Sequence, residues 1–286
     1  MDTHHHTEKL PKAPLIYSFL VMIGVGLFGM ASAETQVVFD PNHPMYQTVL
    51  STVVKDGLVN YQSLKASPES LKRYQERLSQ VTRSQFDTWE EPDQLAMLIN
   101  LYNAATLELI ITHYPVNSIR DIGSFFRGPW KQRFVRLFGD TITLDTLEHK
   151  IIRVDYDEPR IHMVLVCAAI GCPNLRDEPY VGSRLEAQMD EQTEAFLTSD
   201  KGMVIDRENK TVSVSSIFKW YGDDWINKYS PAAGFDGLNR TEKAVMAFCS
   251  RYVSQQDRAY LAAGGYRVRY LDYDWSLNKQ KEKSNE

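Results

Sequence analysis

The chain has 286 residues and a net charge of −5 at pH 7 with histidine counted as neutral. This length allows one large or two small domains with a sizeable hydrophobic core. An acidic chain lacks the basic face that a nucleic-acid partner requires, so we expect no nucleic-acid binding.

The first 33 residues have the pattern of a secretory signal peptide. Lys9 and Lys12 precede an uncharged run over residues 13–30, and Ala31-Ser32-Ala33 offers a cleavage site before Glu34. An uncleaved membrane anchor is the alternative, because the run is nearly long enough to span a bilayer. Its glycines and the cleavage site favour the signal peptide. We therefore expect a mature protein that starts at Glu34, lies in the periplasm or outside the cell, and has no membrane attachment.

Helical patterns dominate the first half of the mature chain. An amphipathic segment covers residues 46–54, a turn at residues 57–61 leads into an extended stretch, and helix signals return over residues 68–81. Residues 93–113 are apolar around almost the whole circumference of a helix, which predicts a buried central helix. Pro92 suits its first turn and Pro115 its end.

A hairpin and a helix are predicted before the cysteines. Residues 133–138 and 141–144 form the hairpin across Gly139-Asp140, and Asp145 is expected to cap a helix that runs through Arg153. Glu148 stands at capping-box spacing from Asp145, so we assign it a structural role and not that of a general base.

The segment 161–166 is apolar and rich in β-branched residues, which predicts a buried strand that ends at a turn. Pro173 is a residue favoured at the first position of a helix, so Cys172 would be the N-cap. Unpaired backbone N–H groups and the helix dipole would favour a thiolate there.

Further along we expect a helix over residues 182–197, a hairpin of residues 203–205 and 211–214, a helix that holds Cys249, and a strand over residues 266–273. Residues 279–286 form a polar tail. The sequence contains neither repeats nor a long linker. It therefore predicts a single α+β domain over residues 34–278, with the central helix packed on a mostly antiparallel sheet.

Three cysteines in an oxidising compartment leave at least one unpaired. Cys249 follows the apolar stripe of its helix and is expected to be buried and inert. Cys172 is a nucleophile, is joined to Cys167 in a disulfide, or is merely a packed turn residue, and the sequence leaves these alternatives open. No second Cys or His pair completes a zinc site, so we expect neither metal nor cofactor.

Four polar residues are candidates for chemistry. Asn100 and Asn103 lie three apart on the central helix, so their amides share one face. One alternative is that they form hydrogen bonds with the backbone of loops, as most buried asparagines do. The other is that one of them orients an imidazole or stabilises an oxyanion. His149 is the first candidate for a general base. His162 is the second, because an imidazole within an apolar strand must find a partner.

Short motifs carry a family resemblance. They are GLVNY (57–61), INLYNA (99–104), SIRDI (118–122), LEH (147–149), PRIH (159–162), GCP (171–173) with Cys167, IFKWY (217–221) and YDWSLN (273–278). With these motifs the sequence resembles the family called domain of unknown function 547. The resemblance implies an uncharacterised activity and a papain-like, cysteine-peptidase-type fold. Because this chain presents Asn, then His, then Cys, that fold would require a circularly permuted arrangement.

The leading hypothesis is a thiol-dependent hydrolase or acyl transferase that acts on an amide or thioester of a small molecule or peptide. Cys172 would be the nucleophile, His149 or His162 the base, and Asn100 or Asn103 the orienting group. Residues expected to contact substrate are Tyr102, Arg160 and Cys167. The alternative is a non-catalytic periplasmic binding or interaction domain.

Overall fold

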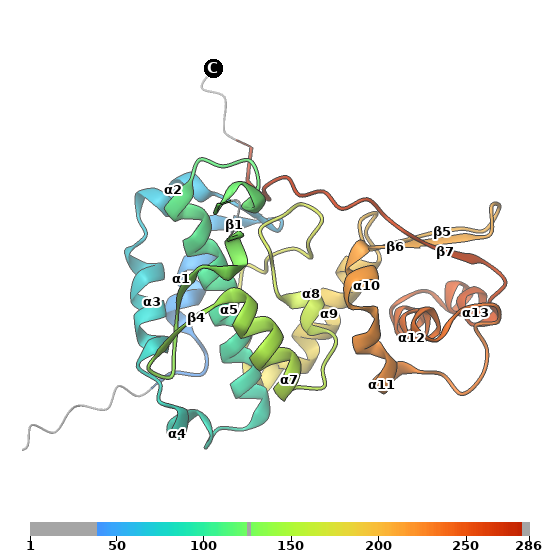
Figure 1. Cartoon of the computed structure of the whole chain (residues 1–286), viewed down its shortest axis with the longest axis horizontal. Coiled ribbons are helices and arrows are strands. Elements are labelled where there is room, and N and C mark those ends of the chain that lie inside the picture. Colours follow the sequence, from blue (N-terminus) through green and yellow to red (C-terminus); the bar gives the residue numbers. More distant parts are fainter. Residues whose placement is uncertain (1–38, 125–126, 282–286) are drawn as a thin grey trace, which may run out of the picture. The chain divides into compact units, whose positions relative to one another are not determined.

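The computed structural model describes residues 39–124 and 127–281. All of them fall within one compact unit (Figure 1). The expected signal peptide and the last five residues of the expected tail lie outside the described residues.

Helices form most of the described chain, and their bounds are as follows. The α-helices are α1 (Pro44–Val53), α2 (Tyr61–Ala66), α3 (Glu69–Ser79), α4 (Arg83–Phe86), α5 (Glu91–His113), α6 (Leu144–Thr146), α7 (Arg153–Asp155), α8 (Ile161–Val164), α9 (Leu185–Leu197), α10 (Ser216–Tyr221), α11 (Ile226–Tyr229), α12 (Arg240–Cys249) and α13 (Gln255–Ala263). A π-helical segment (Leu147–Ile152) joins α6 to α7. Short 3-10 turns lie at Ile119–Asp121, Pro129–Lys131, Gly182–Arg184, Gly222–Trp225 and Ser250–Tyr252.

The described strands are short and form small separate sheets. They are β1 (Val54–Lys55) with β2 (Leu58–Val59), β3 (Arg133–Leu137) with β4 (Asp140–Thr143), and β5 (Met203–Asp206) with β6 (Thr211–Val214) and β7 (Arg267–Tyr270). All pairs are antiparallel except β6 with β7, which is parallel. The α+β class is confirmed, as are the hairpin across Gly139 and the hairpin of β5 and β6.

The predicted central helix is confirmed as α5, and it organises the first hydrophobic core. It contacts α2, α3, α6, the π-helical segment and the turn at Gly182–Arg184, so helices surround it where a sheet was expected. Among the described residues it is the helix long and apolar enough to cross a membrane, yet 89% of its most apolar window is buried inside the protein. Its hydrophobicity therefore serves the core.

A second hydrophobic core is built mainly from the elements that follow α9, with Met163 of α8 and the end of α9. Figure 1 shows where these elements lie. Trp225 and Phe248 are fully buried there and pack at a centroid distance of 5.6 Å. Cys249 ends α12 in the same core with no exposed surface, and burial raises the pKa of its thiol well above the ordinary value. The prediction that Cys249 is buried is confirmed.

The strand expected over residues 161–166 is wrong in its first part. Residues 161–164 form α8, and only the chain after it is extended. The extended part pairs with a side chain and not with another strand. The amide of Asn103 donates to the carbonyl oxygen of Val164 at 3.0 Å and accepts from the backbone N–H of Val166 at 2.9 Å. A short apolar run fits a buried helix and a buried strand equally well, which is why periodicity misled here.

Two expected helix caps are also wrong. Thr143 caps the helix after β4, because its hydroxyl accepts from the backbone N–H of Thr146; Asp145 lies within the first turn. Pro173 begins no helix, since residues 173–181 form a loop and the next turn starts at Gly182. Cys172 is therefore not an N-cap, and no helix dipole acts on its sulfur.

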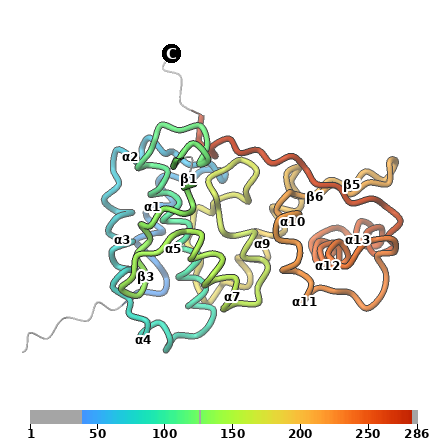
Figure 2. The backbone as a smooth tube through the Cα atoms, in the orientation of Figure 1, coloured from blue at the N-terminus to red at the C-terminus, as the bar shows by residue number. Residues whose placement is uncertain are grey.

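The C-terminal segment connects the two cores. After β7 it runs back toward β2 (Figure 2). The backbone N–H of Asn278 donates to Ala168, and the N–H of Val59 donates to the carbonyl of Asn278. Gln280 continues the pairing with Val59, so the expected polar tail is ordered at least to this residue.

His43 generates a prediction about pH. Its imidazole is buried beside Phe39 and bonds to the hydroxyl of Tyr74 at 2.7 Å. Burial lowers the pKa of His43 from 6.5 to about 4 and outweighs the attraction of Asp40. Between these two pH values the unfolded chain binds a proton that the folded protein does not, so stability falls as the pH falls. At about 1.4 kcal/mol per pH unit the loss is roughly 3 kcal/mol.

We expect His43→Gln to remove this part of the pH dependence. Urea unfolding of both proteins at pH 7 and pH 4 measures it. Parallel stability curves for the two proteins would contradict the assignment.

Candidate functional site

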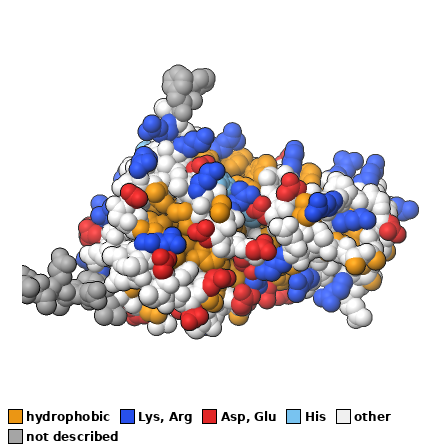
Figure 3. Space-filling view, turned by 60° about the horizontal axis from the view of Figure 1, so that its bottom comes forward, with side chains coloured by type: hydrophobic (Ala, Val, Ile, Leu, Met, Phe, Trp, Pro, Cys, Tyr) orange, Lys and Arg blue, Asp and Glu red, His pale blue; other side chains and the backbone are white. Residues whose placement is uncertain are grey.

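A cavity of about 590 Å³ lies where elements from both cores meet. Aromatic and titratable side chains line it, namely Tyr102, Trp130, Lys131, Asp145, Glu148, His149, His162, Cys167, Trp220, Tyr221, Tyr273 and Trp275, together with Gly128 and Ile217. On the face shown in Figure 3, hydrophobic side chains gather near the middle beside acidic and basic ones. A cavity of this size with convergent polar groups is the usual form of a small-molecule site.

His162 lines the cavity, and a carboxylate behind it holds its imidazole. His162 Nε2 lies 2.7 Å from Asp224 Oδ2, and the imidazole side chain is only 2% exposed. Arg153 holds the same carboxylate through two hydrogen bonds, at 2.8 Å from Nε and 2.7 Å from Nη2. Burial alone would raise the pKa of Asp224, but the bonds from His162 and Arg153 hold it well below its usual range. Asp224 is therefore an anion that fixes the imidazole.

Aromatic rings hold His162 from the sides. Tyr221 stacks on its imidazole at 4.3 Å and 11°, and Trp225 lies at 5.3 Å. Burial, followed by the charge of Glu148, raises the pKa of Tyr221 to about 12, so its hydroxyl stays protonated at neutral pH. The imidazole thus has a fixed ring plane and a fixed partner.

Glu148 and His149 project into the same cavity from the helical segment after β4. Asp145 of α6 lines the cavity with them. His149 Nδ1 lies 3.1 Å from Arg153 Nη1 and 3.8 Å from Glu148 Oε1. Burial and the neighbouring Glu148 raise the pKa of Tyr102 well above its ordinary value.

Glu148 is a residue whose place the sequence did not reveal. Its carboxylate is nearly buried in the cavity. It was expected to cap the helix, but Thr143 performs the capping. π-Helical geometry such as that of Leu147–Ile152 is frequent at functional sites and would have been a useful signal, but it is visible only in the structure.

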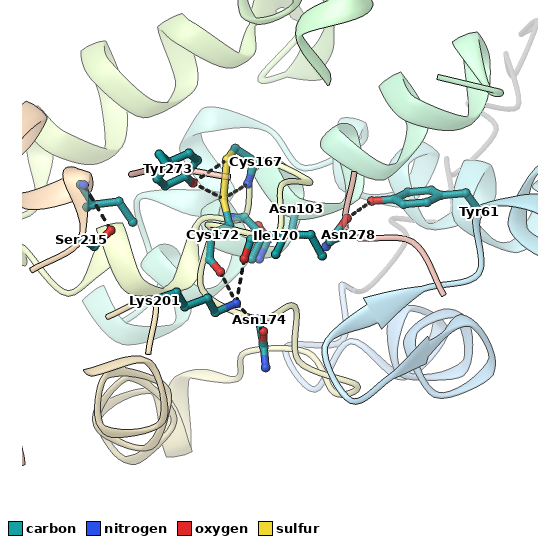
Figure 4. Close-up of a disulfide and its surroundings, with 12 residues drawn as sticks. Tyr61, Asn103, Cys167, Ile170, Cys172, Asn174, Lys201, Ser215, Tyr273 and Asn278 are labelled. Atoms are coloured by element: carbon teal, nitrogen blue, oxygen red, sulfur yellow. Dashed lines mark hydrogen bonds between the residues drawn. A yellow bond between two sulfur atoms is a disulfide. The ribbon is translucent and has the colours of Figure 1, made fainter. Parts of the chain in front are cut away.

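Cys167 and Cys172 are joined by a disulfide with a Cα–Cα distance of 6.3 Å (Figure 4). The backbone N–H of Cys167 and the hydroxyl of Tyr273 both donate to Cys172 Sγ, each at 3.0 Å. Of the two cysteines of the disulfide, only Cys167 lines the cavity, because Cys172 is buried and 2% exposed.

The nucleophile hypothesis for Cys172 is therefore wrong for this oxidised form. Its sulfur is bonded to another sulfur, and among the described residues it makes no hydrogen bond to an imidazole. The disulfide that the sequence left open is the state that the structure shows.

The loop that carries the disulfide is fixed from several sides (Figure 4). The ammonium of Lys201 donates to the carbonyl oxygens of Ile170 and Cys172 and to Asn174 Oδ1. A Cβ atom at Gly171 would lie 3.0 Å from the backbone nitrogen of Asp274 and 3.1 Å from the ring of Tyr273, so a larger residue would require these neighbours to shift by a small amount. The glycine of the GCP motif thus lets the C-terminal segment approach the loop.

Other predicted site residues lie outside the cavity lining. The amide of Asn100 pairs with both backbone groups of Tyr180, at 2.7 and 2.9 Å, and Asn103 pairs with the chain that leads into Cys167. Arg160 is buried and bonds to Glu158, Glu186 and Asp190. The structure thus brings His149, His162, Cys167 and Tyr102 together and gives Asn100, Asn103 and Arg160 structural partners.

In the part of the chain that the structure describes, no group of three His, Cys, Asp or Glu residues could hold a metal ion.

The disulfide loop, His149, His162 and both buried asparagines fall within one segment that matches a known family. Residues 86–197 match the model described as a protein of unknown function, DUF547. Over these residues the chain is similar to the DUF547 family. The DUF547 region runs from the end of α4 to the end of α9, so Asp224 and most of the aromatic wall lie beyond it. No curated protein and no solved structure gives a significant match to the chain.

The disulfide gives a prediction about thiol reactivity. We expect native, non-reduced protein to resist iodoacetamide at all three cysteines, because two are bonded and Cys249 is buried with a raised pKa. Mass mapping of non-reduced peptides should find Cys167 linked to Cys172. Alkylation of Cys172 without prior reduction would contradict the disulfide.

Proposed function

We propose that this protein is a hydrolase or acyl transferase that acts on an amide or thioester in the cavity, with His162 as general base. The observation that carries the proposal is the 2.7 Å hydrogen bond that Asp224 makes with His162, a residue that lines the cavity. A base that is oriented by a carboxylate and placed in the main pocket is the arrangement that acyl-transfer chemistry requires.

The path of the proton follows from this bond. Asp224 occupies Nε2 of His162, and none of the hydrogen bonds of the described residues uses Nδ1. In the proposal Nδ1 takes the proton of the attacking group and returns it to the leaving nitrogen or sulfur. Asp224 stays ionised throughout and stabilises the imidazolium. Glu148 and His149 are the second acid–base pair within the same cavity.

The nucleophile differs from the one predicted from sequence. In the oxidised protein both candidate thiols are consumed, so the proposal assigns attack to water or to an acceptor hydroxyl. Reduction of the disulfide would release the thiol of Cys167 into the same cavity, which is the thiol-dependent form of the proposal. Cys172 would remain behind it.

Export belongs to the proposal as well. The leader pattern of residues 1–33 supports a periplasmic or extracellular protein, and a disulfide suits an oxidising compartment. The peptide map of the exported protein should then begin at Glu34.

The second candidate is a non-catalytic binding domain. Two observations favour it. The disulfide leaves neither Cys167 nor Cys172 as a free thiol, and the wall of the cavity is largely aromatic. The two candidates differ in whether His162 affects turnover.

We expect His162→Gln to lower kcat by about 10²-fold or more on a p-nitrophenyl ester, a p-nitroanilide or a thioester probe, because it removes the base. The matched control is His113→Gln at the end of α5, outside the cavity, which should keep wild-type kcat. Circular dichroism should confirm that both variants fold. Equal kcat in His162→Gln and the wild type would contradict the assignment, and the absence of turnover of all three probes by the wild type would leave the binding domain as the function.

A further inference from the structure

We propose that the cavity binds a neutral sugar ring, which stacks on Trp220 and places its hydroxyl groups toward Asp145 and Glu148. This inference rests on the proposed function in one respect: it takes the cavity as the substrate site and names the class of ligand that the cavity binds.

The aromatic wall supplies the first argument. Trp220 of α10 packs against Tyr273 at 4.9 Å and against Trp275 at 5.8 Å and 28°. Trp130 extends the wall at 6.0 Å from Trp275. In spite of these contacts Trp220 remains 45% exposed, which makes it one of the few large exposed hydrophobic residues of the described chain. An indole held in place by neighbours and open to solvent is a platform for a flat, weakly polar ring face.

The charged lining residues disfavour an anionic ligand. Asp145 and Glu148 contribute two carboxylates, and Lys131 is the one lysine or arginine among the lining residues. The nearby carboxylate of Asp224 is already paired with Arg153. The lining residues therefore carry a net negative charge with their histidines neutral, and Arg120 beside Trp275 offsets it in part.

Guanidinium groups of the protein disfavour a ligand cation on two of the lining rings. Arg120 lies 5.2 Å from the ring centroid of Trp275, and Arg153 lies 5.1 Å from that of Tyr221. A ligand cation on either ring would meet like charge. Trp220 is not one of these two rings, so the polar groups of the cavity, and not its charge alone, decide the ligand.

The polar groups distinguish a sugar from an aromatic ligand. Asp145 and Glu148 offer several carboxylate oxygens as hydrogen-bond acceptors in the cavity that Trp220 also lines, whereas Nδ1 of His149 already accepts from Arg153. Acceptors in such numbers are satisfied by a ligand with many O–H donors along its edge. A pyranose combines such an edge with an apolar C–H face, whereas an aromatic amide would leave most of the acceptors without a partner.

Isothermal titration of the folded, disulfide-bonded protein with chitotetraose, cellotetraose and maltotetraose tests the inference. We expect at least one of these neutral sugars to bind at millimolar concentration or below. Trp220→Ala should weaken that binding about tenfold, and Trp220→Phe should retain most of it. The matched control is Tyr270→Ala on β7, an aromatic residue 40% exposed and outside the cavity, which should bind as the wild type does.

Choline, citrate and N-acetyltyrosine amide represent the cationic, anionic and aromatic alternatives. Binding of any of these in place of the sugars, an affinity unchanged by Trp220→Ala, or no binding by any sugar would overturn the inference. The titration requires no turnover. A protein that binds a sugar but hydrolyses no probe would refute the proposed function alone, and one that hydrolyses probes but binds no sugar would refute the sugar site alone.

Discussion

Two buried amides on α5 are the constraint on which the site depends. Asn100 and Asn103 each use one side chain to satisfy an N–H and a carbonyl of a distant chain segment, as a neighbouring strand would. Because a buried backbone group without a partner costs roughly 1–3 kcal/mol, each asparagine specifies where its segment lies against the helix. Asn103 thereby fixes the chain between α8 and Cys167, and with it the approach of both His162 and the disulfide to the cavity.

The cavity is assembled from parts that are far apart in sequence. His162 comes from α8, its partner Asp224 lies 62 residues later, and Tyr273 comes from the C-terminal segment that returns across the first core. The rigid part is the disulfide loop, held by Asn103, Lys201 and the C-terminal segment together. Such a fixed wall suits a site that orients a substrate, since its groups need no rearrangement before they act.

Local features could be predicted from the sequence, and long-range contacts could not. The apolar circumference of residues 93–113 and the turn at Gly139 are local signals, and both were interpreted correctly. The strand expected over residues 161–166 was wrong in its first part, because a short apolar run fits a helix as well as a strand. The partner of its extended part is a side chain 63 residues earlier, which no periodicity reports. Asp224 was missed because its contact with His162 is also long-range. Glu148 was assigned a capping role that Thr143 performs. The family was predicted correctly from its motifs, but its name brought no residue roles with it.

Amide hydrogen exchange at Val166 and Tyr180 tests the central claim most directly. Both N–H groups donate to asparagine side chains of α5 at 2.9 Å, although both residues lie outside regular secondary structure. The account predicts that they exchange as slowly as the amides of α5, and that Asn103→Leu abolishes the protection of Val166 while that of Tyr180 remains. Exchange of Val166 at the rate of an open loop in the wild-type protein would contradict it.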